Sequence, residues 1–444
     1  MVQRILVPFQ GDGAGTGELT WGQREVWREL RFTGAPLNMG GVDPVPAGMT
    51  VADFVTMLRL LVQRHPSLRT RFLVDDEGRP CRQVLSDAGE IPLEIVDTDG
   101  DPAATAEAVR RRYKGKPFDY PNEWPLRMAL VRRNGELTHV VVMYSHLALD
   151  GFSLQQVLVP ELANLATAEP NRGMSTLEQA RQQATDTARR QSDGALRHWT
   201  KALRTVPAAR FRASATVTDR RYWDAAYRSP ATRLAAHAIA ARGRAEPTPV
   251  LLAAFAITLA AVTGRHPIVV QVLVSNRFRP GFADTVSPIA QTGLCVLDVA
   301  GIPFDEAVGR ARQASIVASM NAYYDPDQRE RLIAAAERDR GEDIDLSCFF
   351  NHRALPRAGP MPAVDDDELR DALAHSALTW DAPTVKRNER LFLSIDDQPD
   401  RMDYSVSVDT RFFSLADTEA LVRGMESLLV SAAVDHRSRA TPSA

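Results

Sequence analysis

The sequence predicts a protein of the α/β class with two domains. Its 444 residues are enough for two domains of ordinary size. Runs rich in β-branched residues, at 138–144 and 268–274, have the composition of buried strands. They alternate with apolar stripes of helical spacing, of which 51–62 and 247–263 are the clearest. We therefore expect two domains of similar build, each with a mainly antiparallel or mixed sheet and helices packed outside it.

Composition and charge exclude several classes of function. A hydrophobic fraction of 44% and a charged fraction of 25% are ordinary for a soluble globular protein. The net charge of −3 gives no electrostatic case for a nucleic-acid or membrane partner. No apolar run approaches the length of a bilayer span, and the N-terminus lacks the core of a signal peptide. We expect a cytoplasmic protein.

The number and spacing of the cysteines also favour a cytoplasmic protein. Cys81, Cys295 and Cys348 are odd in number and far apart in the sequence. This spacing argues against a disulfide framework and against a zinc cluster. We expect reduced thiols and no metal.

The elements of the N-terminal half follow from local signals. Thr20 is placed to cap a helix whose apolar face carries Trp27 and Leu30. Asn134–Gly135 is a strong hairpin turn signal between two apolar runs. The further expected elements are a helix at 51–62 that Pro66 ends, a strand at 70–74, a turn at 75–78, a return strand at 81–85, a basic helix at 103–113 and strands at 124–131 and 138–144.

The C-terminal half continues with alternating helices and strands. We place the domain boundary near residue 180, next to a helical stretch at 176–190 that is dense in Gln, Arg and Ala. The elements expected after it are a helix at 247–263 that Gly264 closes, a strand at 268–274, a helix at 304–320, a strand at 345–351, a meander of 390–395 with 402–408, and a closing helix at 415–434.

One stretch combines a buried strand with reactive side chains. The strand at 138–144 runs into the sequence Ser-His-Leu-Ala-Leu-Asp-Gly at 145–151, after which the pattern turns helical. Catalytic groups often occupy such strand-to-helix turns. The other interpretation is an ordinary turn with an Asp and a Gly, and the motif alone favours neither.

This stretch resembles the His-His-x-x-x-Asp-Gly motif of the condensation domains of nonribosomal peptide synthetases and their relatives in the chloramphenicol acetyltransferase superfamily. Ser145 stands where the motif has its first His. Residues 64–72 match the family's Arg-His-x-x-Leu-Arg-Thr-x-Phe motif at every fixed position, and His65 within them is expected to be structural. The other similarities, in chain order, lie at 20–27, 117–131, 198–203, 275–277 and, in part, 286–294. The resemblance extends from Thr20 to about Val434.

The resemblance implies a fold and a set of site residues. The fold would be two chloramphenicol acetyltransferase-like subdomains in a V shape, residues 1–180 and 181–444, with the active site in the cleft between them. His146 would be the catalytic residue, and Asp150 would be structural and pair with an arginine, for which Arg277 is the best match. The remaining site residues are the motif supports Ser145 and Gly151, and the candidate channel-lining residues Ser287, Gln291 and Asn351.

The chemistry of condensation is consistent with this assignment. An acyl thioester and an amine or alcohol react when the nucleophile loses a proton, which an imidazole with an unperturbed pKa of about 6.5 can accept. His146 is the only histidine on a strand-to-helix turn, and His352 is its nearest rival. Ser145 and His146 are neighbours at a strand end, so alternation would turn them to opposite faces and argues against a hydrolase triad. The chain also lacks a Gly-x-Ser-x-Gly motif.

The partners that we expect depend on two features that we do not find in the sequence. We see no adenylation-like stretch and no Gly-Gly-x-Ser carrier site, so we expect a free-standing enzyme that acts in trans. It would bind no cofactor of its own and would take an acyl or aminoacyl group from the phosphopantetheine arm of a separate acyl or peptidyl carrier protein. The acceptor would be a small-molecule or carrier-bound amine or alcohol. The alternatives are a non-catalytic docking module that recruits partner proteins and an acyl-coenzyme A-dependent acyltransferase.

Overall fold

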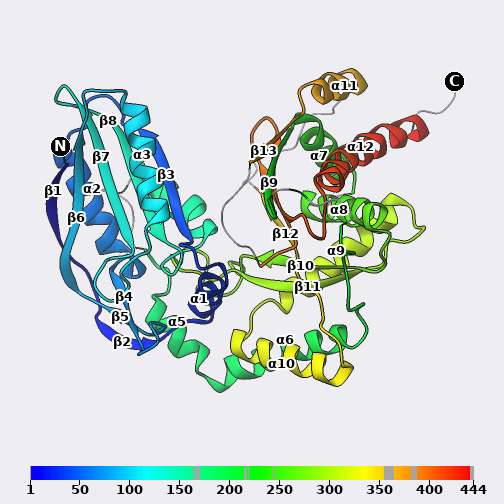
Figure 1. Ribbon diagram of the computed structural model, residues 1–444, viewed down its shortest axis with the longest axis horizontal. Helices are drawn as coiled ribbons and strands as arrows, with labels where there is room; N and C mark the ends of the chain where they lie inside the picture. The colour runs from blue at the N-terminus through cyan, green and yellow to red at the C-terminus, as the bar shows by residue number, and fades with distance from the viewer. Residues whose placement is uncertain are drawn as a thin grey trace. The chain divides into compact units, whose positions relative to one another are not determined.

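The chain divides into two compact units. The computed structural model describes residues 2–163, 165, 171–214, 218, 220–243, 246–354, 365–381 and 388–440 (Figure 1). Unit 1 comprises Met1–Gln191 with Ser275–Gln291, and unit 2 comprises Ser192–Val274 with Thr292–Ala444. This division differs from the expected boundary near residue 180, because the chain stays in unit 1 for longer and residues 275–291 also belong to it.

Unit 1 contains a mixed sheet of five strands and a smaller sheet of three within the described residues. Its elements are β1 (Val2–Gln10), β2 (Gly15–Glu18), α1 (Trp21–Thr33), β3 (Asn38–Pro44), α2 (Val51–Arg64), the 3₁₀ turn η1 (Pro66–Arg69), β4 (Thr70–Val74), β5 (Pro80–Leu85), β6 (Ala88–Asp97), α3 (Pro102–Gly115), β7 (Leu126–Arg133), β8 (Glu136–Ser145), the π-helical segment η2 (Ser153–Leu158), α4 (Val159–Leu162) and α5 (Thr176–Gln183). The larger sheet has the order β1-β6-β7-β8-β3, in which β6 and β7 are parallel. The smaller sheet is β2-β5-β4.

The five-stranded sheet is covered on both faces. Because side chains alternate along a strand, neighbouring residues of β7 belong to different cores. Met128 and Leu130 pack in the cluster that contains α2, whereas Ala129 and Val131 pack in the cluster that contains α3 (Figure 1). Unit 1 is therefore a helix–sheet–helix arrangement with β7 as the central strand of its larger sheet.

Unit 2 is built on one mixed sheet of seven strands within the described residues. Its elements are α6 (Asp186–Leu203, whose first turns lie in unit 1), β9 (Tyr222–Ser229), α7 (Pro230–Arg242), α8 (Pro247–Thr263), β10 (Ile268–Val274), β11 (Gln291–Leu297), α9 (Phe304–Met320), α10 (Pro326–Arg340), β12 (Cys348–Arg353), α11 (Asp366–Ala374), β13 (Ala377–Asp381), β14 (Leu391–Asp397), β15 (Met402–Asp409) and α12 (Leu415–Ala440). The strand order is β11-β10-β12-β14-β15-β9-β13, and β10, β12 and β14 are parallel.

The two faces of this sheet also carry separate cores. Ile268 and Val270 of β10 pack in the large cluster formed with α7, α8, α9 and α12. Val269, which points the other way, packs with Trp199 of α6 and with α10. Within the described residues no single helix has the length and apolarity to cross a membrane, and α7 and α8 reach that threshold only as one bent pair.

Several local predictions are confirmed at the level of single residues. The helix at 247–263, the strand at 268–274 and the helix at 304–320 have the expected bounds. Asn134 and Gly135 both have positive φ, 51° and 86°, as a two-residue turn between twisted antiparallel strands requires. The helix expected at 176–190 is instead two helices, α5 and α6.

The N-terminus of α1 is closed by a hydrogen-bonded cap between Thr20 and Gln23, both of which are buried. The Thr20 hydroxyl accepts a hydrogen bond from the Gln23 backbone (3.1 Å), and the Gln23 side chain accepts one from the Thr20 backbone (2.8 Å). This reciprocal cap satisfies two backbone donors that a helix start leaves unpaired. Gln23 also donates to the side chain of Gln83 in β5 (3.4 Å), so the cap ties α1 to the small sheet.

Candidate active site

His146 lies on the turn that joins β8 to the following helix. The strand ends at Ser145, and the Ala148 N–H donates to the Ser145 carbonyl (3.0 Å). This bond closes a β-turn whose central residues are His146 and Leu147. Helical structure resumes at Gly151, so the predicted strand-to-helix turn is confirmed.

The turn also sets which ring nitrogen of His146 carries the proton. Its Nδ1 lies 2.8 Å from the carbonyl oxygen of Leu149. A carbonyl can only accept a hydrogen bond, so Nδ1 is the protonated nitrogen of the neutral ring. Nε2 then holds the lone pair. The His146 side chain is partly exposed, whereas Ser145 and Leu147 on either side of it are buried. The site thus presents one basic nitrogen in a fixed tautomer.

Ser145 makes contacts that are separate from those of His146. Its hydroxyl accepts a hydrogen bond from the Leu147 N–H (3.3 Å) and also bonds the phenol of Tyr120. Burial raises the pKa of Tyr120, so this phenol stays protonated at neutral pH. Sequence reasoning attributed the separation of Ser145 and His146 to strand alternation. The structure corrects that reason, since β8 ends at Ser145 and His146 belongs to the turn.

Asp150 is the most heavily bonded side chain of the motif. Its Oδ1 accepts from the backbone (2.8 Å) and hydroxyl (2.8 Å) of Ser153 and from Arg277 Nη2 (2.7 Å). Its Oδ2 accepts from the backbone N–H groups of Ile289 (3.0 Å) and Ala290 (3.2 Å). The carboxylate therefore caps the helix after the motif and holds the segment at 275–291 in unit 1.

The predicted ion pair between Asp150 and Arg277 is confirmed. The two side chains are 4% and 6% exposed. Arg277 Nη1 also donates to the carbonyls of Phe282 (3.1 Å) and Thr285, and its guanidinium stacks 4.8 Å from the centre of the Phe152 ring. Burial lowers the pKa of Arg277, and the charge of Asp150 opposes that shift. A buried pair with this many further hydrogen bonds offsets its desolvation cost.

Gly151 has no packing requirement for glycine among its described neighbours. A Cβ atom at this position would meet only the Met39 methyl, at 3.9 Å. Its φ also lies outside the left-handed region. We assign no structural cause to the glycine.

Ser287 has a different environment from the one expected. It is fully buried, and its hydroxyl donates to the Gln179 side chain (3.0 Å). Its backbone N–H donates to the Ser153 hydroxyl (3.2 Å). Instead of lining a channel, Ser287 fastens the segment at 275–291 to α5 and to the helix after the motif. Gln291, the first residue of β11, is 3% exposed.

Asn351 and His352 lie in unit 2, on β12. Asn351 Nδ2 donates to the hydroxyl of Ser394, its partner residue on β14 (3.2 Å). His352 Nδ1 bonds the Thr248 hydroxyl (2.8 Å), and burial lowers the pKa of His352 to about 4. An imidazole with so low a pKa is a weak base and therefore a poor candidate for proton transfer at neutral pH.

His65 has the structural role expected for it. It is fully buried, its Nε2 lies 2.6 Å from Glu161, and its Nδ1 lies 2.9 Å from the Asn171 amide. Because Asn171 donates and the carboxylate accepts, the proton sits on Nε2. Both ring nitrogens of His65 are thus engaged in hydrogen bonds that hold the structure.

Two residues of the site were not singled out from the sequence. Ser153 bonds both Asp150 and Arg277, and its signal in the sequence is the Asp three residues earlier, a common N-cap residue whose carboxylate accepts from the Ser153 N–H. Gly22 is the second. A Cβ atom at Gly22 would lie 1.7 Å from the Pro288 carbonyl oxygen, so α1 packs directly against the backbone that Asp150 holds. No local sequence pattern indicates such a close approach.

Comparison with protein families and curated proteins identifies relatives of this chain. The family model for the condensation domain matches residues 39–340. Phosphinothricin tripeptide synthetase PhsC of Streptomyces viridochromogenes is 27% identical over 335 residues, which are 70% of this chain and 30% of that protein. The polyketide synthase-nonribosomal peptide synthetase pyiS of Pyricularia grisea is 30% identical over 144 residues, 32% of this chain and 4% of that protein. The chain thus spans less than a third of these relatives.

Solved structures show the same fold. The condensation domain that mediates chain release from the enacyloxin polyketide synthase has a TM-score of 0.73 at 19% identity, over 98% of this chain and 85% of that one. SgcC5 of Streptomyces globisporus has a TM-score of 0.68 at 18% identity, over 94% and 98%. The X-domain from teicoplanin biosynthesis, solved with OxyB, has a TM-score of 0.69 at 17% identity, over 96% and 95%. At these identities the likeness concerns the fold alone.

Proposed function

Because this chain belongs to the condensation domain family, we propose that it is an acyltransferase of natural-product biosynthesis that acts in trans. It would transfer an acyl or aminoacyl group from a carrier-protein thioester to an amine or alcohol, which forms an amide or an ester. The observation that carries this proposal is the tautomer of His146, whose Nδ1–H is committed to the Leu149 carbonyl while Nε2 keeps its lone pair.

The transfer can be written with His146 as the only proton carrier. Nε2 accepts the proton of the acceptor's N–H or O–H as that nitrogen or oxygen attacks the thioester carbonyl. The tetrahedral oxyanion then collapses and the carbon–sulfur bond breaks. The pantetheine sulfur leaves and takes the proton back from Nε2, so the ring returns to its starting tautomer. General acid–base assistance of this kind contributes about 10²–10⁴ in rate.

The other motif residues support this geometry from a distance. Both oxygens of Asp150 are occupied by five hydrogen bonds inside unit 1. Asp150 therefore acts as a positioning residue, since it fixes the start of the helix that follows the His146 turn. Arg277 is also a positioning residue, because its terminal nitrogens donate hydrogen bonds to Asp150 and to backbone carbonyls.

The carrier-bound donor is the part of the proposal that rests on surface charge. Coenzyme A needs a local basic site for its nucleotide phosphates, whereas a carrier needs a broader docking surface. Of the basic segments, Arg110 is paired with Glu107 and Arg132 with Asp97, while Arg111 and Arg133 are exposed. Such spread-out cations suit an acidic carrier helix better than a compact phosphate group.

The catalytic assignment is tested by replacing one histidine at a time. Acetyl, octanoyl and alanyl groups are loaded on a phosphopantetheinylated carrier protein and offered with a panel of amines and alcohols. Release of the free carrier thiol is measured. His146→Ala should lower kcat by about 10²–10⁴. His139→Ala, which removes an imidazole from β8, the strand before the His146 turn, should leave kcat nearly unchanged. Equal losses in both variants would contradict the role of His146.

The donor is tested in the same assay. The same acyl groups are offered on coenzyme A at matched concentration. Turnover with coenzyme A at an equal or higher kcat/KM would overturn the choice of a carrier and leave the role of His146 intact.

A non-catalytic docking module is the second candidate. The substitution of the motif's first His by Ser145 favours it. The X-domain likeness is compatible with it, but it concerns the fold alone. No thiol release with any donor, in a protein that folds with the stability described below, would favour docking over catalysis.

A further inference from the structure

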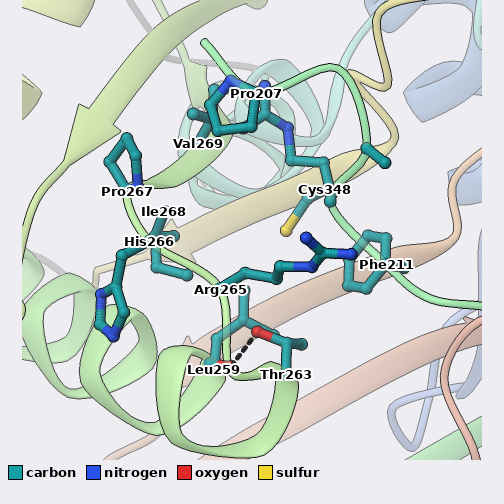
Figure 2. Close-up of a pocket in the computed structure, with 12 residues that line it drawn as sticks. Pro207, Phe211, Leu259, Thr263, Arg265, His266, Pro267, Ile268, Val269 and Cys348 are labelled. Carbon is teal, nitrogen blue, oxygen red and sulfur yellow. Dashed lines mark hydrogen bonds between the residues drawn. The ribbon is translucent and has the colours of Figure 1, made fainter.

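Unit 2 contains a cavity that is lined by none of the candidate site residues. Its volume is about 50 Å³, several times the roughly 10–15 Å³ that one water molecule needs. Ile268 and Cys348, the first residues of the parallel strands β10 and β12, both line it (Figure 2). The cavity is therefore at the amino ends of these strands, whereas Asn351 and His352 lie toward the other end of β12.

Arg210 brings an unpaired positive charge to this cavity. The residue is 6% exposed, and its Nε donates to the carbonyl of Asp345 (2.7 Å). Neither terminal nitrogen has a hydrogen-bond partner among the described residues. Burial lowers the pKa of Arg210 to about 10, so the guanidinium remains protonated at neutral pH.

The neighbouring charges do not neutralise Arg210. The carboxylate of Asp345 is engaged by Arg390 (2.7 Å) and by Ser347. Arg340, a further cation nearby, is bonded to two carbonyls and to Glu342. The surroundings of Arg210 thus add at least as much positive as negative charge.

Arg265 supplies a second guanidinium to the cavity wall. Its Nε is buried and has no hydrogen-bond partner in the part of the chain that the structure describes. In Figure 2 its guanidinium extends between Cys348 and Phe211. An uncompensated buried charge costs several kcal/mol, so the buried guanidinium of Arg210, with that of the partly exposed Arg265 at the same cavity, favours an anionic ligand.

We propose that this cavity binds a small organic carboxylate, held by the two terminal nitrogens of Arg210 and by Arg265. The planar fork of an arginine matches the two oxygens of a carboxylate. The other walls are largely apolar, with Phe211, Leu259 and Ile268 among them, and would pack against the body of the acid. A phosphate would leave oxygens without donors against these walls. The proposal is independent of acyl transfer by His146.

Titration calorimetry tests the proposal on the whole chain. Acetate, butyrate, benzoate and inorganic phosphate are titrated into the wild-type protein, with chloride balancing the ionic strength. We expect saturable binding of at least one carboxylate and a rise in Tm that grows with its concentration. Arg210→Met should weaken binding by about 10–100-fold, which corresponds to the loss of a charge-assisted hydrogen bond. Arg212→Met removes the same charge from an exposed position two residues away and should leave binding unchanged.

The outcomes separate the parts of the proposal. Absence of saturable carboxylate binding to wild type, or equal binding to Arg210→Met, would overturn it. Tighter binding of phosphate than of any carboxylate would overturn the ligand class. If Arg210→Met does not fold, Arg210→Lys and Arg265→Met take its place. Lysine keeps the charge and loses the fork, so Arg210→Lys should also weaken binding by about 10-fold.

Discussion

Removal of Asp150 should damage the stability of unit 1 before it damages the chemistry. Asp150→Ala breaks five hydrogen bonds and leaves the Arg277 side chain, which is 6% exposed, without its counter-charge. Breaking a buried ion pair by removal of one partner costs about 3–5 kcal/mol. For a unit of roughly 200 residues each kcal/mol shifts Tm by about 2–4 °C, so the expected loss is about 6–20 °C.

The assay compares thermal and urea unfolding with kcat at a temperature where both proteins are folded. Asp76→Ala is the matched control, because Asp76 is an exposed carboxylate of unit 1 and its removal changes the net charge equally. It should change the free energy of unfolding by less than about 0.5 kcal/mol. An Asp150→Ala protein as stable as the control, or one with normal stability and a large loss of kcat, would refute the structural role.

Three further predictions address the motif, α1 and β12. Ser145→Ala should cost only a modest factor in kcat, since the hydroxyl bonds the turn and not the His146 ring; a loss equal to that of His146→Ala would place Ser145 in the chemistry. Gly22→Ala should lower Tm although Ala favours a helix by about 1 kcal/mol, because its Cβ would lie 1.7 Å from the Pro288 oxygen; Gly115→Ala, with open space around it, is the control. Burial lowers the pKa of His352 to about 4, so the unfolded chain binds the extra proton and stability should fall between about pH 6.5 and pH 4 by up to about 3 kcal/mol. Urea titrations of His352→Gln should show a flatter dependence on pH over that range.

The fold was most predictable where the hydrophobic pattern is long and regular. α8, β10 and α9 have the expected bounds because an uninterrupted apolar run or stripe leaves few alternatives. β1 was not expected, and Pro8 near its C-terminal end is a signal against a strand. The structure tolerates this proline because β1 is an edge strand of its sheet. The helix expected at 176–190 is broken because the Thr185 hydroxyl accepts from the Ala188 N–H and starts α6 anew.

The site was predictable where its contacts are local. The turn around His146 is readable from a strand followed by a helical pattern, and the cap by Asp150 lies within the motif. The partner of Asp150 is 127 residues away, so only the resemblance to a family could suggest Arg277. Ser287 was placed in a channel because a sequence does not tell which way a loop hydroxyl points. Nothing local separates Arg210 from the exposed Arg212 either.

Two buried arginines therefore give opposite expectations for the same substitution. Arg277 has a carboxylate, carbonyls and an aromatic ring around it, so Arg277→Met removes favourable contacts and should lower Tm. Arg210 has one carbonyl and no partner for its terminal nitrogens among the described residues, so Arg210→Met relieves a desolvated charge and should leave Tm unchanged or raise it. A saturating carboxylate should reverse the order of Tm between wild type and Arg210→Met, because the wild-type protein binds the ligand more tightly and gains more stability from it. Asp150→Ala would leave Arg277 with its carbonyl partners and its aromatic neighbour but without its carboxylate, so its cost should be that of a buried ion pair broken on one side.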